Sequence, residues 1–216
     1  MTNLAEINSQ LRALLDDSNA KRYTDSLLDA AIVQTLEEIS QRLPGLLSAQ
    51  HTVTIAGRDQ VLSALTGCRY IVSIIRLEGS AACCELEPET SFTYLLLDGV
   101  PTLHFLGGDI PNIGETLIIH YAANYTLEGL AGQSATTLPA TLENALVIGA
   151  AAQACFIRAT NLVESYGLYG NESKRLEQVA NGWRATFERT LNGLKTLQEF
   201  GFPPGFPLDL WDPVRQ

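Results

Sequence analysis

The spacing of apolar residues changes twice along this chain of 216 residues. Residues 3–16 and 24–43 repeat apolar side chains every three or four positions, which is the period of an amphipathic helix. The middle of the chain alternates or runs through β-branched residues, as strands do. Helical spacing returns after Pro139. The chain therefore predicts helices on both sides of a β-rich middle.

The N-terminal helices have clear start and stop signals. Thr24 is a good N-cap for the second helix, and Asp25 places a negative charge in its first turn. We expect that helix to stop at Pro44-Gly45, because proline cannot continue a helix. Asp16-Asp17 resembles a calcium loop superficially but lacks the glycine and terminal glutamate of an EF-hand, so it reads better as a helix terminator.

Four or five strands are predicted in the middle, at residues 51–55, 70–77, 91–97, 100–106 and 115–122. Asp98-Gly99 joins two of them, and a two-residue Asp-Gly loop between apolar strands is a strong hairpin signal. The strands are joined locally, so the sheet is expected to be antiparallel. Residues 126–138 are small and polar, which is typical of a loop.

Two further helices are expected in the C-terminal half. The first covers residues 139–166, and the low bulk of Gly149–Ala154 at its centre lets another backbone approach closely. The second, of about 28 residues, makes a rod of roughly 40 Å. Its apolar stripe consists of Leu176, Val179, Trp183, Phe187, Leu191, Leu194 and Leu197.

These elements predict an α+β fold: an antiparallel helical bundle of about four helices, an inserted antiparallel β-sheet module and an extended C-terminal tail. Residues 1–47 and 126–200 are assigned to the bundle, residues 48–125 to the inserted β module and residues 201–216 to the tail. The N-terminus lacks a signal-peptide pattern, and apolar stretches such as Ala145–Ala152 are too short to span a bilayer. We therefore expect a soluble protein made in the cytoplasm, with no membrane partner.

The tail, GFPPGFPLDLWDPVRQ, combines prolines with large apolar side chains and has no regular structure of its own. It either packs back on its own domain or docks on a neighbouring chain. Docking is favoured, because a proline-rich segment is already extended and loses less entropy on binding. The candidate docking residues are Phe202, Pro203, Pro204, Phe206, Leu210 and Trp211.

The net charge is −10, from 14 basic and 24 acidic residues, so the basic surface with which proteins grip nucleic acid is absent. Negative charge serves ordinary solubility, and it also suits a channel along which DNA must slide. No catalytic, cofactor or metal-binding motif occurs. The cysteines Cys68, Cys83, Cys84 and Cys155 lack zinc-ligand spacing and are expected to be reduced and buried.

Two weaker patterns fit structural roles better than functional ones. His51, His104 and His120 all fall in predicted strands, where hydrogen-bonding or surface roles are commoner than catalysis. His104 and His120 could share a sheet with Cys83 or Cys84, but a nucleophilic Cys-His pair also needs an orienting group. Glu85, Glu87 and Glu89 alternate, which indicates a solvated strand edge rather than a cation site.

The helical blocks resemble phage head-to-tail adaptor (connector) proteins of short-tailed phages. Tyr23-Thr24-Asp25 and Arg42-Leu43-Pro44 are similar to the family's helix start and stop. The segment Thr137-Leu138-Pro139, Glu143 and the Gly/Ala-rich helix after it look like its return into the bundle. The β-rich middle is similar to a sheet module inserted in such adaptors.

The resemblance implies a non-enzymatic ring, commonly a dodecamer, in the virion neck below the portal. The ring would bind the portal protein and the tail (nozzle or fibre) proteins, and DNA would pass through it without sequence-specific binding. The C-terminal segment would reach the portal or a neighbouring subunit. A tail-completion factor or tail-assembly chaperone remains an alternative, and a small Cys-His enzyme a remote one.

Overall fold

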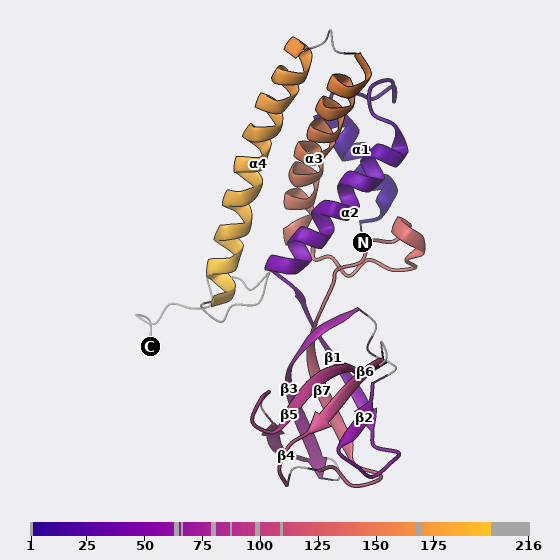
Figure 1. Ribbon diagram of the computed structural model, residues 1–216, viewed down its shortest axis with the longest axis vertical. Coiled ribbons are helices and arrows are strands. Elements are labelled where there is room, and N and C mark those ends of the chain that lie inside the picture. Colours follow the sequence, from indigo (N-terminus) through magenta and orange to yellow (C-terminus); the bar gives the residue numbers. More distant parts are fainter. Residues whose placement is uncertain are drawn as a thin grey trace. The chain divides into compact units, whose positions relative to one another are not determined.

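The computed structural model describes residues 2–62, 65, 67–78, 81–86, 88–97, 100–108, 110–166 and 170–199. The chain forms two compact units: a helical unit, residues 1–43 and 125–216, and a β unit, residues 44–124. Four α-helices lie in the described part of the first unit, and antiparallel sheets form the second (Figure 1). The expected α+β fold class is confirmed.

Helices α1 (Leu4–Leu14) and α2 (Asp25–Arg42) begin at polar caps. Asn3 accepts a hydrogen bond from the Glu6 N–H, and the Glu6 side chain accepts one from the Asn3 N–H, forming a capping box. Thr24 accepts from the Leu27 N–H at 3.3 Å, as its N-cap role predicts. Helix α2 ends at Arg42, directly before Leu43-Pro44, which confirms the predicted stop.

Helix α3 (Ala140–Tyr166) is the central helix of its unit and packs against α1, α2 and α4 (Gly170–Glu199). Figure 1 shows it flanked by α4 on one side and by α1 and α2 on the other. At Gly149 a Cβ atom would come within 2.5 Å of Thr35 Cγ2 and 2.8 Å of Phe187 Cε2. The small centre of α3 therefore does let its neighbours approach closely.

The apolar stripe of α4 differs from the predicted one at one position. Ala180 is fully buried, whereas Val179 is 40% exposed, because the helix turns its 176–180–183–187–191 row toward α3. Phe187 and Leu191 are buried and Leu176, Trp183 and Leu194 are half-buried against the core. The side chain of Leu197 lies outside the described residues.

Helix α3 is also more apolar than its short runs suggested. Ala140–Val163, 24 residues, is long and apolar enough to cross a membrane by length and composition, with a mean hydropathy of 1.5 over one 18-residue window. The expectation that every apolar stretch is too short was therefore wrong by that measure. Half of the window is buried inside the structure, as in the core helix of a bundle.

The β unit contains seven strands in its described part, more than the four or five predicted. They are β1 (Gly45–Thr52), β2 (Asp59–Val61), β3 (Cys68–Glu78), β4 (Ala81–Leu86), β5 (Phe92–Leu97), β6 (Val100–Phe105) and β7 (Thr116–Ala123). They form a four-stranded sheet, β1-β7-β3-β4, and a three-stranded sheet, β2-β6-β5. All their ladders are antiparallel, as expected.

Two strand predictions need correction. The strand expected at residues 51–55 runs instead from Gly45 to Thr52 and ends before Val53, whose side chain enters the core. The expected local order also fails, because β1 pairs along its whole length with β7, the last strand of the unit. The hairpin between residues 91–97 and 100–106 is confirmed by the pairing of Leu97 with Val100, although Asp98-Gly99 lies outside the described residues.

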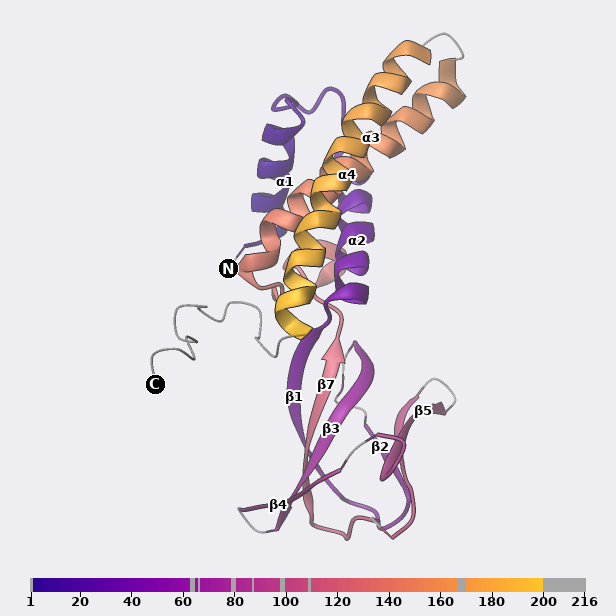
Figure 2. The same cartoon turned by 90° about the vertical axis from the view of Figure 1, so that its left-hand side faces the viewer.

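The two sheets share one apolar core. Its buried residues in the four-stranded sheet include Ile71, Ile74, Leu117, Ile119 and Tyr121. Phe92, Leu103 and Phe105 contribute from the three-stranded sheet. The strands of the two sheets lie in separate layers in Figure 2. Each sheet therefore has an inner face on the core and an outer face.

Candidate assembly surfaces

The predicted docking residues, Phe202, Pro203, Pro204, Phe206, Leu210 and Trp211, lie outside the described residues. The described chain stops at Glu199, at the end of α4. In the described part, the candidate surfaces are the C-terminal ends of α2 and α4 and the exposed apolar side chains of the β unit.

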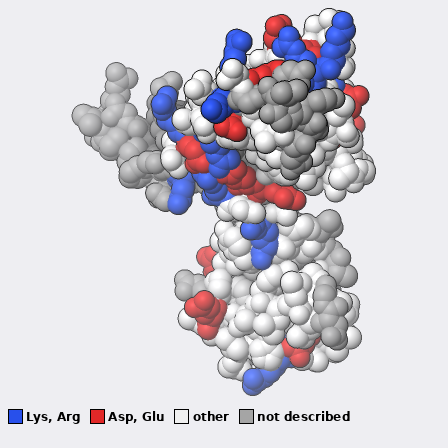
Figure 3. Space-filling model, turned by 45° about the horizontal axis from the view of Figure 1, so that its top comes forward, with Lys and Arg blue, Asp and Glu red and all other residues white. Residues whose placement is uncertain are grey.

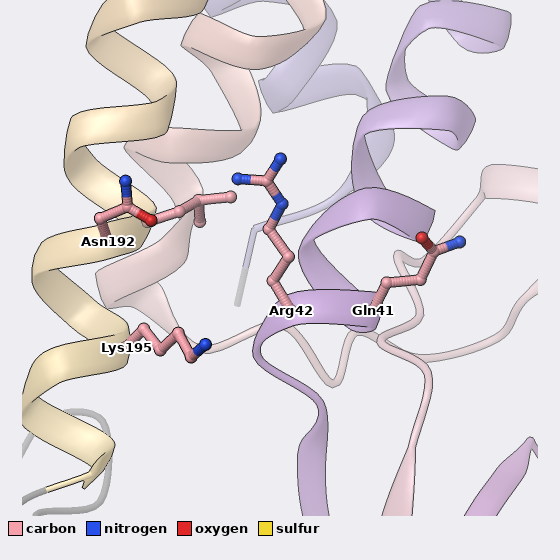
Figure 4. Close-up of a pocket in the computed structure, with 5 residues that line it drawn as sticks. Gln41, Arg42, Asn192 and Lys195 are labelled. Atoms are coloured by element: carbon pink, nitrogen blue, oxygen red, sulfur yellow. The ribbon is translucent and has the colours of Figure 1, made fainter.

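A hollow of about 390 Å³ opens between the C-terminal ends of α2 and α4. Its lining residues are Gln41, Arg42, Leu191, Asn192 and Lys195. Figure 4 shows Gln41 and Arg42 reaching from α2, and Asn192 and Lys195 from α4. Two cationic side chains and two amides make this a polar surface with one apolar wall.

Arg42 belongs to a four-membered ion-pair cluster that links α2 to α4. It contacts Glu38 at 2.8 Å within α2 and forms a bidentate pair with Glu188 of α4. Arg184 of α4 contacts Glu38 at 2.5 Å and Glu188 at 2.7 Å. The hydrogen bond from Arg42 lowers the pKa of Glu188, against the opposing effect of burial. The cluster ties α4 to α2 at this end of the unit.

Asp17 ends helix α1, as predicted, and also holds the turn that follows it. It is only 4% exposed, and it accepts hydrogen bonds from the backbone N–H groups of Lys21, Arg22 and Tyr23 at 2.9 to 3.2 Å. Arg12 adds an ion pair at 3.3 Å. Burial alone raises the pKa of Asp17, but these donors outweigh it and leave the pKa lowered. Asp17 thus closes the loop between α1 and α2, which agrees with a helix terminator and not with a calcium ligand.

The described thiols lack the properties of a nucleophile. Burial raises the pKa of Cys155, although Tyr23 lies 3.2 Å from its sulfur. Burial likewise raises the pKa of Cys68. A catalytic cysteine needs a lowered pKa, so both shifts run the opposite way. The side chains of Cys83 and Cys84 lie outside the described residues.

The histidines do not come together in one site. His104 lies in β6 and contacts Asp59 of β2 at 2.7 Å, whereas His51 and His120 lie in the other sheet. His104 therefore does not share a sheet with β4, the strand of Cys83 and Cys84, contrary to one of the two possible pairings. His120 does share that sheet, but β3 lies between their strands.

The three glutamates do not form an alternating row either. Glu85 is exposed on β4, which is an edge strand, as the solvated-edge interpretation predicts. Glu89 lies beyond the strand with a φ of 66°, a left-handed conformation that breaks the alternation. Glu87 lies outside the described residues.

Exposed apolar side chains concentrate in the β unit. Among its described residues twelve large ones are exposed: Leu46, Leu47, Ile55, Val61, Tyr70, Val72, Leu95, Leu96, Leu97, Val100, Ile110 and Ile113. The described part of the helical unit has three, Leu14, Val163 and Val179. Charged side chains crowd the helical unit in Figure 3, whereas the β unit shows few on the visible face. Where such side chains lie next to one another they are candidates for a protein-binding surface.

The described residues thus define an α+β protein with many exposed apolar side chains on its β unit. The sequence model of the SU10 adaptor protein family matches residues 2–204, and the chain therefore belongs to that family. The resemblance to adaptor proteins is confirmed, and with it the structural role of a head-to-tail adaptor.

Solved structures of particle necks are also similar. The neck of an empty GTA particle computed with C6 symmetry matches at 20% identity with a TM-score of 0.32, over 68% of this chain and 74% of that chain. The neck of a native GTA particle computed with C12 symmetry matches at 18% identity with a TM-score of 0.31, over 69% and 79%. No curated protein sequence is significantly similar to this chain.

Proposed function

We propose that the protein forms a ring of identical subunits in the virion neck, joining the portal to the tail and extending the DNA channel. The observation that carries the proposal is the family match, which begins at residue 2 and runs through Pro204. It includes the helical unit, the β unit and the first part of the tail. Twelve subunits is the number that the adaptor resemblance favours.

In this proposal each part of the chain has its own task. The helical unit and the β unit act as separate folding domains of the ring, in place of the sequence-based assignment of residues 1–47 with 126–200 and of residues 48–125. Phe202, Pro203, Pro204, Phe206, Leu210 and Trp211 dock on the portal or on a neighbouring subunit. The tail proteins bind the opposite end. The net charge of −10 disfavours binding of DNA, which passes through the ring without being held.

The tail gives the direct test of docking. Deleting residues 201–216 is expected to abolish co-sedimentation with isolated portal rings while leaving the unfolding temperature unchanged. Deleting only residues 212–216 is the matched control, because it keeps all six docking residues and should bind normally. Normal binding by the longer deletion would show that the tail does not dock on the portal.

Mass spectrometry of purified virions separates this function from its alternative. An adaptor remains in the finished particle at a fixed number of copies. A tail-assembly chaperone leaves the particle before it is finished. Absence of this chain from purified virions would therefore favour the chaperone function over the adaptor function.

A further inference from the structure

Strand pairing sorts the exposed apolar residues of the β unit by face. Residues paired directly across an antiparallel ladder point to the same face of the sheet. In β7, Leu117, Ile119 and Tyr121 point into the core, so Ile118 and Ala122 lie on the other face, where Ala122 is itself fully buried.

One apolar patch lies on the outer face of the four-stranded sheet. Leu46 of β1 and Tyr70 of β3 both pair with Ala122, and they are 66% and 50% exposed. Ile75 pairs with Ile118 on the same face, and both are half-buried. His120, which pairs with Ser48 and with Ser73, lies between this row and the row of Leu46 and Tyr70. We name Leu46, Tyr70, Ile75 and Ile118 the β1–β3 patch.

A second patch lies on the outer face of the three-stranded sheet. Its core side is marked by Phe92, paired with Phe105, so Leu95 and Leu97 lie on the other face. Leu96 between them is on the core side but is also exposed, because the end of β5 extends past the core. Leu95 pairs with Thr102, which also pairs with Val61, and Leu97 pairs with Val100. All four aliphatic residues are exposed, Val61 by 53% and Leu97 by 47%. We name Val61, Leu95, Leu97 and Val100 the β5–β6 patch.

The β5 edge adds to this second patch. Strand β5 lies at the edge of its sheet, and its sequence FTYLLL holds no charge and no proline. Proteins usually protect such edges with charges, as Glu85 does on β4 and Asp59 does on β2. An unprotected apolar edge aggregates unless a defined partner covers it.

The two patches point in opposite directions. Each lies on an outer face, and the two sheets pack on each other through their inner faces. A surface that pairs with itself makes a closed two-fold dimer, whereas two different surfaces on opposite sides of one molecule join copies head to tail. Head-to-tail contacts with rotation close into rings.

The size of the patches fits the same arrangement. The four exposed aliphatic side chains of the β5–β6 patch offer roughly 300 Å² of apolar area, whereas a stable pairwise interface buries about 800 Å² per partner. One such contact alone is weak. A subunit that makes one contact at each side, and closes a ring, doubles its buried area.

We propose that the β units associate head to tail, with the β1–β3 patch of one copy of this chain covering the β5–β6 patch of the next. This inference rests on the proposed ring and adds the surface through which neighbouring subunits meet. One kind of partner, a second copy, covers both patches at once.

A pair of complementary variants of the full chain tests it. Tyr70→Asp breaks the β1–β3 patch and Leu97→Asp breaks the β5–β6 patch, both at exposed positions. By sedimentation velocity at concentrations of a few hundred micromolar, the wild-type chain should associate, and each variant alone should lose at least about tenfold in association constant. A one-to-one mixture should recover dimers and nothing larger, because only one intact pair of patches remains.

The controls keep the result decisive. Val163→Asp introduces the same charge at an equally exposed valine of α3 and should associate as the wild type does. If an Asp variant lowers the unfolding temperature, the test uses Tyr70→Thr and Leu97→Thr instead. Threonine removes the large apolar side chain and still favours a strand. A monomeric wild type, normal association of either variant, a mixture without dimers or an equal loss in Val163→Asp overturns the proposal. If the doubly substituted chain still forms a ring on the portal, the proposed interface is wrong and the proposed adaptor ring is not affected.

Discussion

Gly149 of α3 lies directly against the ring of Phe187 of α4. A Cβ atom at position 149 would be 2.8 Å from Phe187 Cε2 and 2.9 Å from Phe187 Cδ2, closer than such atoms approach in proteins. Thr35 of α2 crowds the same point at 2.5 Å. Gly149 is therefore where α3 is held between the two long helices that flank it.

Substitution of Gly149 by alanine should destabilise the protein. Alanine has the better helix propensity, but its methyl group must displace Phe187 or Thr35 in a close-packed core, which costs about 1–3 kcal/mol. Chemical denaturation followed by circular dichroism measures the change in the free energy of unfolding.

Gly182→Ala is the matched control for that measurement. Gly182 lies in α4, and a Cβ atom added there would meet nothing within 4 Å. Alanine should therefore stabilise the protein by about 0.5–1 kcal/mol through helix propensity alone. Equal stabilisation by both substitutions would contradict the close contact at Gly149.

The sequence predicted what depends on local pattern. Thr24 and Pro44 mark the start and the end of α2, because caps and prolines act on neighbouring backbone groups. The small centre of α3 was also predictable, since Gly149 leaves room whatever packs there. The choice between Val179 and Ala180 was not, because both fit a spacing of three or four and only the packing partner selects one.

Long-range pairing and buried polar contacts escaped prediction for a different reason. Leu46 and Leu47 fell within residues 1–47, which the sequence assigned to the helical bundle, because β1 becomes a strand only by pairing with β7, far along the chain. Asp17 looked like one of two equivalent acidic residues, and only the turn of the backbone aims three N–H groups at it. The candidate docking tail was visible in composition, whereas the two apolar patches needed the strand register.

Asp17→Asn should cost about 1.5–3 kcal/mol at neutral pH, because a buried carboxylate that accepts several N–H bonds is replaced by a neutral amide. Asp16→Asn removes the same charge at an exposed position and should change stability little. Urea denaturation of the two variants gives the comparison. Equal small effects would show that the Asp17 hydrogen bonds do not hold the loop.

The same carboxylate predicts a pH dependence. The pKa of Asp17 is lower in the folded chain than in the unfolded one, so its contribution is complete above the unfolded pKa, about 3.9, and is lost as the pH falls through the folded pKa. The stability difference between wild type and Asp17→Asn should therefore shrink below about pH 4. A difference that is constant with pH would contradict the lowered pKa.

The ion-pair cluster should contribute modestly and depend on salt. A double-mutant cycle with Arg42→Ala and Glu188→Ala should give a coupling below about 1 kcal/mol, because both side chains are about a third exposed. High salt should reduce it. Arg189→Ala in place of Arg42→Ala is the control, since neighbours along a helix do not face each other. A coupling unchanged by salt would contradict an electrostatic link.

Cys155 should react slowly with alkylating reagents. Burial raises its pKa, so little thiolate is present at neutral pH, and the residue is only 2% exposed. Mass spectrometry of each cysteine after brief iodoacetamide treatment should show modification at Cys155 only after unfolding. If Cys155 reacts faster in the folded chain than in urea, the result would support the hypothesis of a Cys-His enzyme.

The central claim is that this chain forms the ring between portal and tail. Electron cryo-microscopy of the neck of purified particles tests it most directly. We predict a closed ring of copies of this chain, with helical units and β units resolved, touching the portal on one side and the tail on the other. A neck in which the portal contacts the tail without this chain between them would contradict it.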